Sequence, residues 1–532
     1  NVVFKSTDDG KTWSIISPDL TRHDPKTLGS SGGPITKDQT SVEYYGTVFA
    51  LQESPITPGL LWAGSDDGLI HITRDGGKTW KNVTPKWPEW MRVSIIDPSP
   101  HNPGTAYVAG NRYQLDDMTP YLYKTTDYGA TWTKITDGIV GTEFTRAIRE
   151  DLIRPGMLYA ATERSMWLSY DAGAHWQSLA RNLPPVPVHD IALRDDDMVI
   201  ATHGRAFWAM ENLTPLRNAP EVALASGKNY FYKPAPVYRV GGASATVMYR
   251  LAKADDVVTL EFLDGAGKLI KKYASTDTQP TPPAGRGGGG GGRGGFGGPP
   301  VVTNRAGLNT YRWDMRYPDA SNFRGMILWA GGVQGPTIAP GAYTVRLTVG
   351  ADKPVSQTLI VKRDPRSSAT DADLIAQTQF ALKLRDRMTE ADDAVKKIRS
   401  IKEQLDDRAP KMSNVKEFGA LSKSLTDSIG SVEDSVYQTR NKSGEDPLNF
   451  PVRLNNQIAA LMGFVQSGDR RPPPQALQVF ATVSPKLDIQ LGRYDKSVKL
   501  YLDKINALLK AAGLQPIVPT TVEGPPKPNV AM

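Results

Sequence analysis

Short apolar runs separated by polar turns dominate the first 217 residues of this chain. The runs come in pairs, and each run has the length and boundaries of a β-strand. The pairs lie at 60–64 and 69–72, at 105–109 and 121–123, at 157–161 and 166–168, and at 198–201 and 206–209. Pro-Gly turns come before the first three pairs. The pattern predicts a series of small antiparallel sheets.

One motif follows each of the first three pairs and also occurs near the start of the chain. It reads Ser/Thr-x-Asp-x-Gly-x-Thr/His-Trp and is an Asp box. Its Asp, Gly and Trp are Asp8, Gly10 and Trp13; Asp75, Gly77 and Trp80; Asp127, Gly129 and Trp132; and Asp171, Gly173 and Trp176. In such a turn the short side chains accept hydrogen bonds from backbone N–H groups, the glycine takes a positive φ and the Trp covers the turn. We therefore expect the Asp-box residues to be structural.

The motif and its flanking strands form an internal repeat, which is typical of β-propeller blades. The first strands of the blades are expected at 46–51, 93–96, 144–148 and 188–193. The last pair of runs lacks an Asp box and is expected to form the closing blade. The chain is expected to open inside the third strand of a blade. Because a propeller closes its ring to remove sheet edges, we expect residues 1–217 to be an incomplete propeller that lacks upstream blades.

Three segments carry a resemblance to a known family. They are 87–100, 116–129, and 188–190 together with 201–205, and they resemble the propeller of large secreted bacterial proteins of the sortilin-like or sialidase-like Asp-box type, also called BNR-repeat proteins. Members are commonly labelled glycosyl hydrolases. The resemblance covers 1–217 and implies the C-terminal portion of such a propeller, in a secreted, periplasmic or cell-surface protein.

Strand patterns return beyond the repeats, at 257–263, 309–313 and 342–349. The segment 228–363 resembles a small Ig-like domain, so we expect an Ig-like β-sandwich there. A Gly-rich stretch at 282–300 interrupts one of its hairpins. Its composition is typical of a flexible linker, so we expect a disordered loop rather than an RNA-binding segment.

From residue 370 the apolar period becomes helical. The stripes comprise Ala381, Leu384, Met388, Ala391, Val395, Ile398 and Leu405; Phe418, Leu421, Leu425, Ile429, Val432 and Val436; Leu454, Ile458, Leu461 and Phe464; and Leu477, Phe480, Leu487, Leu491, Tyr494, Val498, Ile505 and Leu508. They predict an antiparallel helical bundle over 370–514, with a start at Thr370, a kink near Pro485 and an end at Gly513. Most of these positions are expected in the bundle core, and a partner helix is the alternative. A Pro-rich tail is expected at 515–532. The fold class is thus multidomain, mainly β and then α.

Composition limits the chemistry. The chain has 532 residues, 63 basic and 56 acidic, with a net charge of +7. This mild excess does not indicate a nucleic-acid partner, and no apolar run approaches the ~20 residues of a membrane span. The absence of Cys excludes disulfides and thiol catalysis. The six His residues show no metal-ligand spacing, so neither a metal nor a cofactor is expected.

Blade topology places the candidate ligand site. In an up-and-down blade the Asp-box turn and the first-to-second turn share one end. The second-to-third turns and the blade connections therefore meet at the opposite end, which we call the mouth. Aromatic and charged residues from several blades converge there, as ligand recognition requires. The candidates are Asp66, Asp67, Trp87, Trp90, Arg92, Arg112, Tyr113, Glu143, Glu163, Arg164, His189, His203 and Arg205.

Two functions fit this organisation. The first is a binding protein whose mouth recognises a glycan or a peptide. A protein partner would then dock on the helical bundle or on the missing N-terminal blades. The alternative is a glycoside hydrolase of sialidase-like or xyloglucanase-like type, which would need a pair of opposed carboxylates. No carboxylate is singled out by its spacing, so the catalytic residues are unknown and the binding function is favoured.

Overall fold

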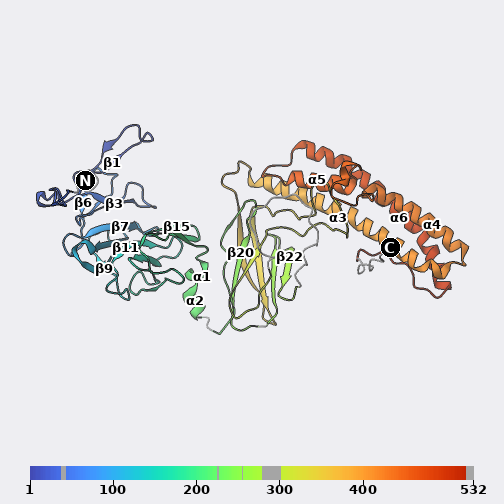
Figure 1. The fold of residues 1–532 in the computed structure, drawn as a ribbon, viewed down its shortest axis with the longest axis horizontal. Coiled ribbons are helices and arrows are strands. Elements are labelled where there is room, and N and C mark those ends of the chain that lie inside the picture. Colours follow the sequence, from blue (N-terminus) through green and yellow to red (C-terminus); the bar gives the residue numbers. More distant parts are fainter. Residues whose placement is uncertain (38–43, 225–226, 255, 278–300, 523–532) are drawn as a thin grey trace. The chain divides into compact units, whose positions relative to one another are not determined.

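The computed structural model describes residues 1–37, 44–224, 227–254, 256–277 and 301–522. The predicted disordered loop at 282–300 lies outside the described residues, as does the tail from 523. The chain divides into two compact units, Asn1–Ala223 and Leu224–Met532. The first is built mainly from strands, and the second combines strands with long helices (Figure 1).

The first unit contains antiparallel sheets whose strands pair in sequence order. A two-stranded sheet at the start holds β1 (Phe4–Lys5) and β2 (Ser14–Ile15). Three four-stranded sheets follow: β3 (Val48–Glu53), β4 (Leu61–Ser65), β5 (Ile70–Thr73) and β6 (Lys81–Asn82); β7 (Arg92–Pro98), β8 (Ala106–Arg112), β9 (Asp117–Thr125) and β10 (Thr133–Lys134); and β11 (Thr145–Glu150), β12 (Leu158–Thr162), β13 (Met166–Ser169) and β14 (Gln177–Ser178). The last sheet holds β15 (Val188–Arg194), β16 (Asp197–Thr202) and β17 (Phe207–Met210).

Each of these sheets is called a blade below, because its strands follow the predicted order. Two short helices, α1 (Thr214–Arg217) and α2 (Ala219–Leu224), follow the last blade. Arg217 is buried and forms ion pairs with Asp151 and Asp196. This pairing fixes α1 against the blades, since a buried guanidinium needs its partners.

Repeated backbone hydrogen bonds define the two ends of a blade. At one end the first-to-second turn accepts a bond from the Asp-box turn, at Gly76 N to Gly59 O (2.9 Å), Tyr128 N to Gly104 O (2.9 Å) and Ala172 N to Gly156 O (2.8 Å). At the other end the second-to-third turn donates to the entry of the first strand, at Asp66 N to Thr47 O (3.1 Å), Glu163 N to Phe144 O (3.1 Å) and His203 N to Pro187 O (2.9 Å). The second end is the mouth that the topology predicts.

The second Asp box shows the bonding of the motif. The Thr73 hydroxyl accepts a hydrogen bond from Gly77 N at 3.0 Å, and the Asp75 carboxylate accepts bonds from the Thr79 N–H at 2.9 Å and its hydroxyl at 2.6 Å. These bonds to the ionised form hold the pKa of Asp75 down at about 2. Gly77 has a φ of 96°, which favours glycine at this position.

Three of the Asp-box Trp residues join neighbouring blades. Their indole N–H groups donate to a carbonyl of the preceding blade, at Trp80 to Ile16 (2.8 Å), Trp132 to Val83 (2.7 Å) and Trp176 to Ile135 (2.8 Å). Trp13 instead donates to Gly10 within its own box at 3.1 Å and is 61% exposed. In these three boxes the motif thus closes its own turn and also fixes its blade to the preceding one.

The second unit begins with a two-layered sandwich. One sheet orders β18 (Tyr230–Phe231), β20 (Ala245–Leu251) and β23 (Gly307–Trp313), and the other orders β19 (Val237–Arg239), β25 (Val355–Arg363), β24 (Gly341–Val349), β21 (Val258–Leu263) and β22 (Leu269–Ala274). Alternate residues of both sheets share one apolar core, in which the rings of Phe262 and Trp313 stack at 4.1 Å. The Ig-like assignment stays a prediction.

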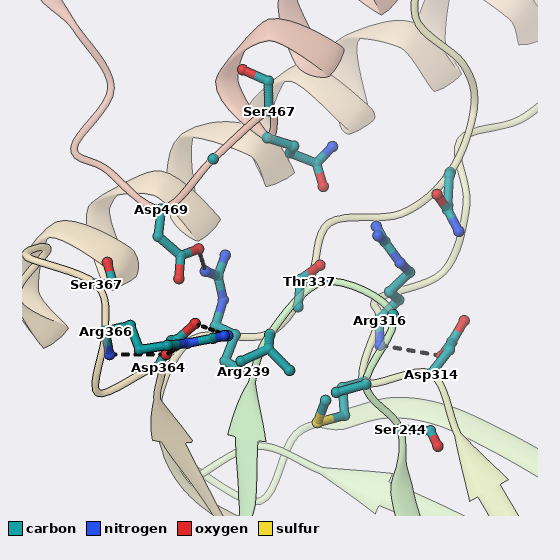
Figure 2. A pocket seen from close by; sticks show the side chains of 18 of the residues that line it. Arg239, Ser244, Asp314, Arg316, Thr337, Asp364, Arg366, Ser367, Ser467 and Asp469 are labelled. Atoms are coloured by element: carbon teal, nitrogen blue, oxygen red, sulfur yellow. Dashed lines mark hydrogen bonds and ion pairs between the residues drawn. The ribbon is translucent and has the colours of Figure 1, made fainter. Parts of the chain in front are cut away.

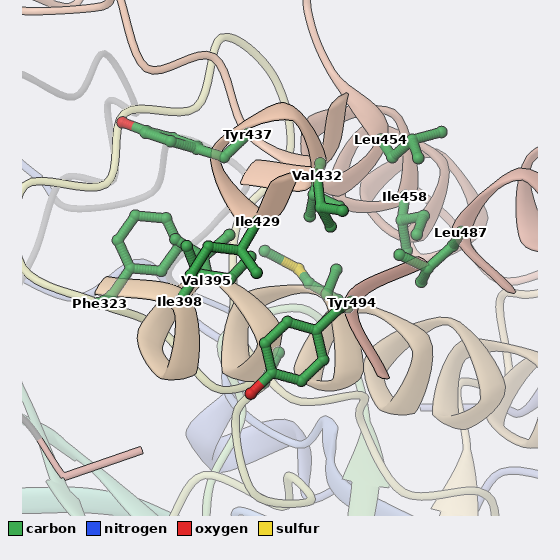
Figure 3. Close-up of a cluster of buried hydrophobic side chains, with 14 of the residues drawn as sticks. Phe323, Val395, Ile398, Ile429, Val432, Tyr437, Leu454, Ile458, Leu487 and Tyr494 are labelled. Carbon is green, nitrogen blue, oxygen red and sulfur yellow. The ribbon is translucent and has the colours of Figure 1, made fainter. Parts of the chain in front are cut away.

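Four helices complete this unit: α3 (Asp371–Arg408), α4 (Lys416–Val436), α5 (Leu454–Val465) and α6 (Pro474–Ala511). Thr370 and Asp373 form a capping box at the start of α3. Figure 3 shows the apolar core between these helices, with Val395, Ile398 and Leu487 buried in it. Gly513, with a φ of 70°, follows α6 as predicted.

The prediction that the helical stripes lie in the bundle core is wrong for Phe464 and Leu477, which are each 49% exposed. The sequence pattern also missed a segment around Phe323, which packs into the bundle core. This segment lies close to α5, because Asn456 accepts a hydrogen bond from Trp329 N at 2.8 Å. Among the described helices, none is both long and apolar enough to cross a membrane.

Candidate functional site at the blade mouth

The first strand of each blade after the two-stranded sheet carries a β-bulge near the mouth. In β3, Val48 pairs with Ser65 and Ala50 pairs with Gly64, so Phe49 is an extra residue. The equivalent extra residues of β7, β11 and β15 are Ser94, Arg146 and His189. A bulge changes the direction of a side chain and is common beside functional sites. The repeat therefore redirects one side chain per blade at the same place.

Arg146 joins neighbouring side chains at the mouth. Its guanidinium pairs with Glu163, with Nη2 at 2.5 Å from Oε2. It also lies 4.9 Å from the centre of the Phe144 ring and 5.6 Å from that of Tyr113. The Tyr113 and Phe144 rings stack on each other at 4.7 Å. Charge pairing and cation–π contact thus hold Arg146 in place.

Arg92 continues this row of contacts towards the preceding blade. Its guanidinium lies 4.1 Å from the centre of the Phe49 ring, and its Nη1 donates a hydrogen bond to the Tyr113 hydroxyl at 3.5 Å. Phe49 keeps 48% of its surface exposed. An aromatic face and two guanidinium groups are therefore within one row that crosses three blades.

His189 and His203 extend the row to the last blade. Their rings lie 5.1 Å apart. Burial lowers the pKa of His189, and the positive charges of Arg146 and Arg92 lower it further. His189 is therefore neutral at pH 7 and can donate or accept a hydrogen bond. We define the mouth cluster as Phe49, Arg92, Tyr113, Phe144, Arg146, Glu163, His189 and His203.

Two of the predicted residues, Asp66 and Asp67, form hydrogen bonds that stabilise the turn in which they lie. Asp67 is buried, and its carboxylate accepts hydrogen bonds from the Ser65 hydroxyl at 2.5 Å and from Arg22 N at 2.8 Å. The carboxylate of Asp66 accepts bonds from Gly46 N at 3.0 Å and Thr47 N at 2.8 Å. Burial nevertheless raises the pKa of Asp66 above its ordinary value. Asp66 therefore fixes the entry of β3, and Asp67 holds the mouth turn to the segment around Arg22.

Other predicted residues have neighbours outside the mouth cluster. Trp87 packs edge-on against Tyr123, and the Trp90 ring lies 6.1 Å from that of Tyr45. Arg112 pairs with Asp117 at 2.7 Å. The remaining candidates are Glu143, which accepts hydrogen bonds from Thr162 and Trp167, and the exposed Arg164 and Arg205.

The sequence analysis missed three members of the mouth cluster region: Phe49, Phe144 and Arg146. A β-bulge shifts the alternation of apolar and polar residues by one position, and strands as short as β3 and β11 offer too few residues to reveal that shift. A comparison of equivalent positions at the starts of the first strands is the signal that points to Arg146, since His189 stands at the same place in the next blade.

A half-buried acidic group lies further along the first strands. Asp97 accepts a hydrogen bond from Glu150 N at 2.8 Å, and Arg149 lies 3.6 Å from it and 2.8 Å from Asp190. Burial raises the pKa of Asp97 to about 7, although Arg149 opposes this shift. Asp97 is therefore partly protonated at neutral pH, as a general acid must be.

Within the described residues, no group of three or more His, Asp or Glu side chains could hold a metal ion. The mouth cluster instead offers aromatic faces, guanidinium donors, a carboxylate and imidazole rings. Such a set suits contact with a ligand that has both apolar surfaces and polar groups.

No family model and no curated protein matches the chain. Among solved structures, an ancestral GH74 enzyme is 15% identical with a TM-score of 0.30, covering 51% of this chain and 35% of that one. The GH74 xyloglucanase from Xanthomonas campestris is 14% identical with a TM-score of 0.30, covering 69% and 63%. YCF48 bound to D1 peptide is 15% identical with a TM-score of 0.24, covering 43% and 68%. The chain spans about a third of the first of these proteins, and likenesses of this size carry no argument about function.

Proposed function

We propose that the mouth cluster binds a glycan or a peptide. The observation that supports this most is the repeated β-bulge, which redirects Phe49, Arg146 and His189 from three blades towards the same end. Neighbouring aromatic rings and cations at that end combine stacking surfaces with charged donors. Both sugars and peptides are bound by such combinations.

We also propose that the blades belong to an Asp-box β-propeller in a secreted or periplasmic protein. The sequence order of strands within each blade and the Trp contacts between blades support the propeller. The location rests on the resemblance to secreted Asp-box proteins alone.

Two matched arginine substitutions test the binding site. Arg92 lies 4.1 Å from the Phe49 ring at the mouth, and Arg74 lies 4.1 Å from the Tyr128 ring at the Asp-box end. The full chain is screened on glycan and peptide arrays, and the affinity of the best ligand is then measured by calorimetry. Arg92→Ala is expected to weaken binding about tenfold or more, as for a central contact residue. Arg74→Ala is expected to bind like wild type.

The arrays also separate the two ligand classes, since a hit on only one of them assigns the ligand to that class. Equal affinities of wild type, Arg92→Ala and Arg146→Ala at unchanged melting temperature would overturn the proposed site.

A glycoside hydrolase is the second candidate, and Asp97 is the residue that favours it. Its pKa of about 7 suits a general acid, and Asp190 provides a second carboxylate on the other side of Arg149. Release of reducing sugar from xyloglucan and of sialic acid from sialosides tests this function. A hydrolase should lose its rate in Asp97→Asn, whereas a binding protein releases no sugar in either form.

A further inference from the structure

A cavity of about 970 Å³ lies within the second unit. It is bordered by the ends of sandwich strands, by the loop 466–469 between α5 and α6, and by the residues after β25 (Figure 2). Its volume is within the range of small-molecule sites. The proposed function does not involve this cavity.

Buried polar contacts fix one wall of the cavity. Arg239, 8% exposed, donates hydrogen bonds to the Ile338 carbonyl at 2.9 Å and to Gln377 at 2.8 Å, and it pairs with Asp469. The amide of Gln377 in turn donates to the Gly468 carbonyl at 2.6 Å. The sandwich, α3 and the loop 466–469 are therefore held together, so the cavity is a built feature of this unit.

The carboxylates that border the cavity already have cationic partners. Asp364 accepts two hydrogen bonds from the guanidinium of Arg366, at 2.9 and 2.8 Å. Asp469 pairs with Arg239, and Lys271 lies 3.6 Å from Asp314. Because these carboxylates are already paired, they do not neutralise the other cations that border the cavity.

Arg316 borders the cavity and forms no ion pair with a described carboxylate, although its backbone N–H donates a hydrogen bond to the Asp314 carboxylate at 3.2 Å. Its Nη1 donates to the Gly335 carbonyl at 2.8 Å, and no described carboxylate lies within ion-pair distance of its guanidinium. Burial lowers the pKa of Arg316, although the charges of Asp314 and Asp319 oppose this shift, and the positive charge of Arg239 adds to it. A half-buried cation in this state is stabilised by an anion from outside the chain.

A second polar group at the cavity requires a different partner. Gln466 borders the cavity, and its Oε1 is buried without a hydrogen-bond donor among the described residues. A buried acceptor of this kind calls for a donor such as a hydroxyl group. The hydroxyl-bearing residues Ser244, Thr337 and Ser367 border the same space.

We propose that this cavity binds a small polyhydroxylated carboxylate, that is, a sugar acid. The carboxylate occupies the space beside the Arg316 guanidinium, and a ligand hydroxyl donates to Gln466 Oε1. A planar guanidinium fits a carboxylate with two parallel hydrogen bonds. A neutral sugar lacks the charge for Arg316, and a simple carboxylate lacks the donor for Gln466.

Calorimetry on the full chain with three matched compounds tests this proposal. D-galacturonate carries both groups, D-galactose has the hydroxyls alone and acetate has the carboxylate alone. Galacturonate is expected to bind at least about tenfold more tightly than either of the others. The methyl glycoside of galacturonate, which resembles the end of a polymer, distinguishes a terminal sugar acid from a free one.

Substitutions assign the contacts. Arg316→Gln is expected to weaken galacturonate binding about tenfold or more, and Arg316→Lys, which keeps the charge, is expected to weaken it less. Gln466→Met should reduce the preference for galacturonate over acetate. Arg305→Gln, which removes an exposed charge outside the cavity, is the control and should bind like wild type.

Any of three results would overturn the proposal. The first is no saturable binding of galacturonate up to about 10 mM, a concentration far above the usual range of Kd values. The others are equal affinity for acetate and galacturonate, and unchanged affinity in folded Arg316→Gln and Arg316→Lys. Thermal melts establish that each variant is folded. Arg316→Gln should leave the affinity of the blade mouth for its best array ligand unchanged, so the two sites can fail separately.

Discussion

Asp392 on α3 has an unusual environment for a carboxyl group. It is fully buried among the helices, it accepts a hydrogen bond from Asn455 at 3.2 Å, and its Oδ2 has no partner among the described residues. Burial raises its pKa from 3.8 to about 7. The folded state therefore binds a proton here over a pH range in which the unfolded state releases it.

Asp392→Asn is expected to change the pH dependence of stability. Protonation of Asp392 stabilises the fold fully below pH 3.8, and this contribution is lost as pH rises through about 7. The variant, which carries no such proton, should be more stable than wild type above pH 7, by on the order of 3 kcal/mol. Urea unfolding at several pH values measures this difference. If the variant and the wild type show the same stability at every pH, the pKa of Asp392 is not raised in the folded state.

The type of a residue in the sequence does not show which partners its side chain has in the folded protein. Asp66 and Asp67 were predicted as ligand groups because both lie in a mouth turn, whereas their carboxylates bond to backbone N–H groups of nearby segments. Arg316 and Asp392 have ordinary sequence surroundings. Their environment comes from segments distant in the chain, and hydrophobic pattern alone carries no information about such contacts.

The Asp box is the element that sequence predicts best, because its bonds are local. Thr, Asp, Gly and Trp at fixed spacing determine the turn, and the strands before it alternate as a strand does. The β-bulges at Phe49, Arg146 and His189 depend on pairing between strands. The sequence therefore located the blades and their mouth but not the side chains that the bulges redirect.

The Trp contacts between blades predict a contrast within one motif. Trp132 donates to Val83 of the preceding blade, whereas Trp13 bonds within its own box and is 61% exposed. Trp132→Ala should cost about 3 kcal/mol, and Trp13→Ala should cost under about 1 kcal/mol. Denaturant unfolding measures both. Equal losses would show that the indole stabilises only its own turn.

At the scale of the whole chain, Arg239 joins the sandwich to the helical bundle. Without this buried guanidinium, Asp469 and the side-chain oxygen of Gln377 lose their partner. Breaking a buried pair in this way lowers the free energy of unfolding by about 3–5 kcal/mol. Arg239→Ala should therefore split the unfolding of residues 224–532 into separate sandwich and helix transitions. Calorimetry with far-ultraviolet circular dichroism follows both. A single transition in the variant would show that other contacts suffice.

The sequence predicted the order of repeats, strands and helices, because each has its own period. The division into two compact units was harder to predict, since the sandwich and the bundle are joined by side chains far apart in sequence. Arg239 and Gln377 meet only in the folded chain, so the cavity beside them had no signal in the pattern.

The central claim is that the mouth cluster is the ligand site, and hydrogen–deuterium exchange of the full chain with the best array ligand tests it most directly. The mouth ends of β3, β7, β11 and β15 carry the bulges, so ligand should slow exchange there and leave the Asp-box turns unchanged. Arg92→Ala should remove this protection at the same ligand concentration. Protection confined to the Asp-box turns, or to residues 224–532, would contradict the account.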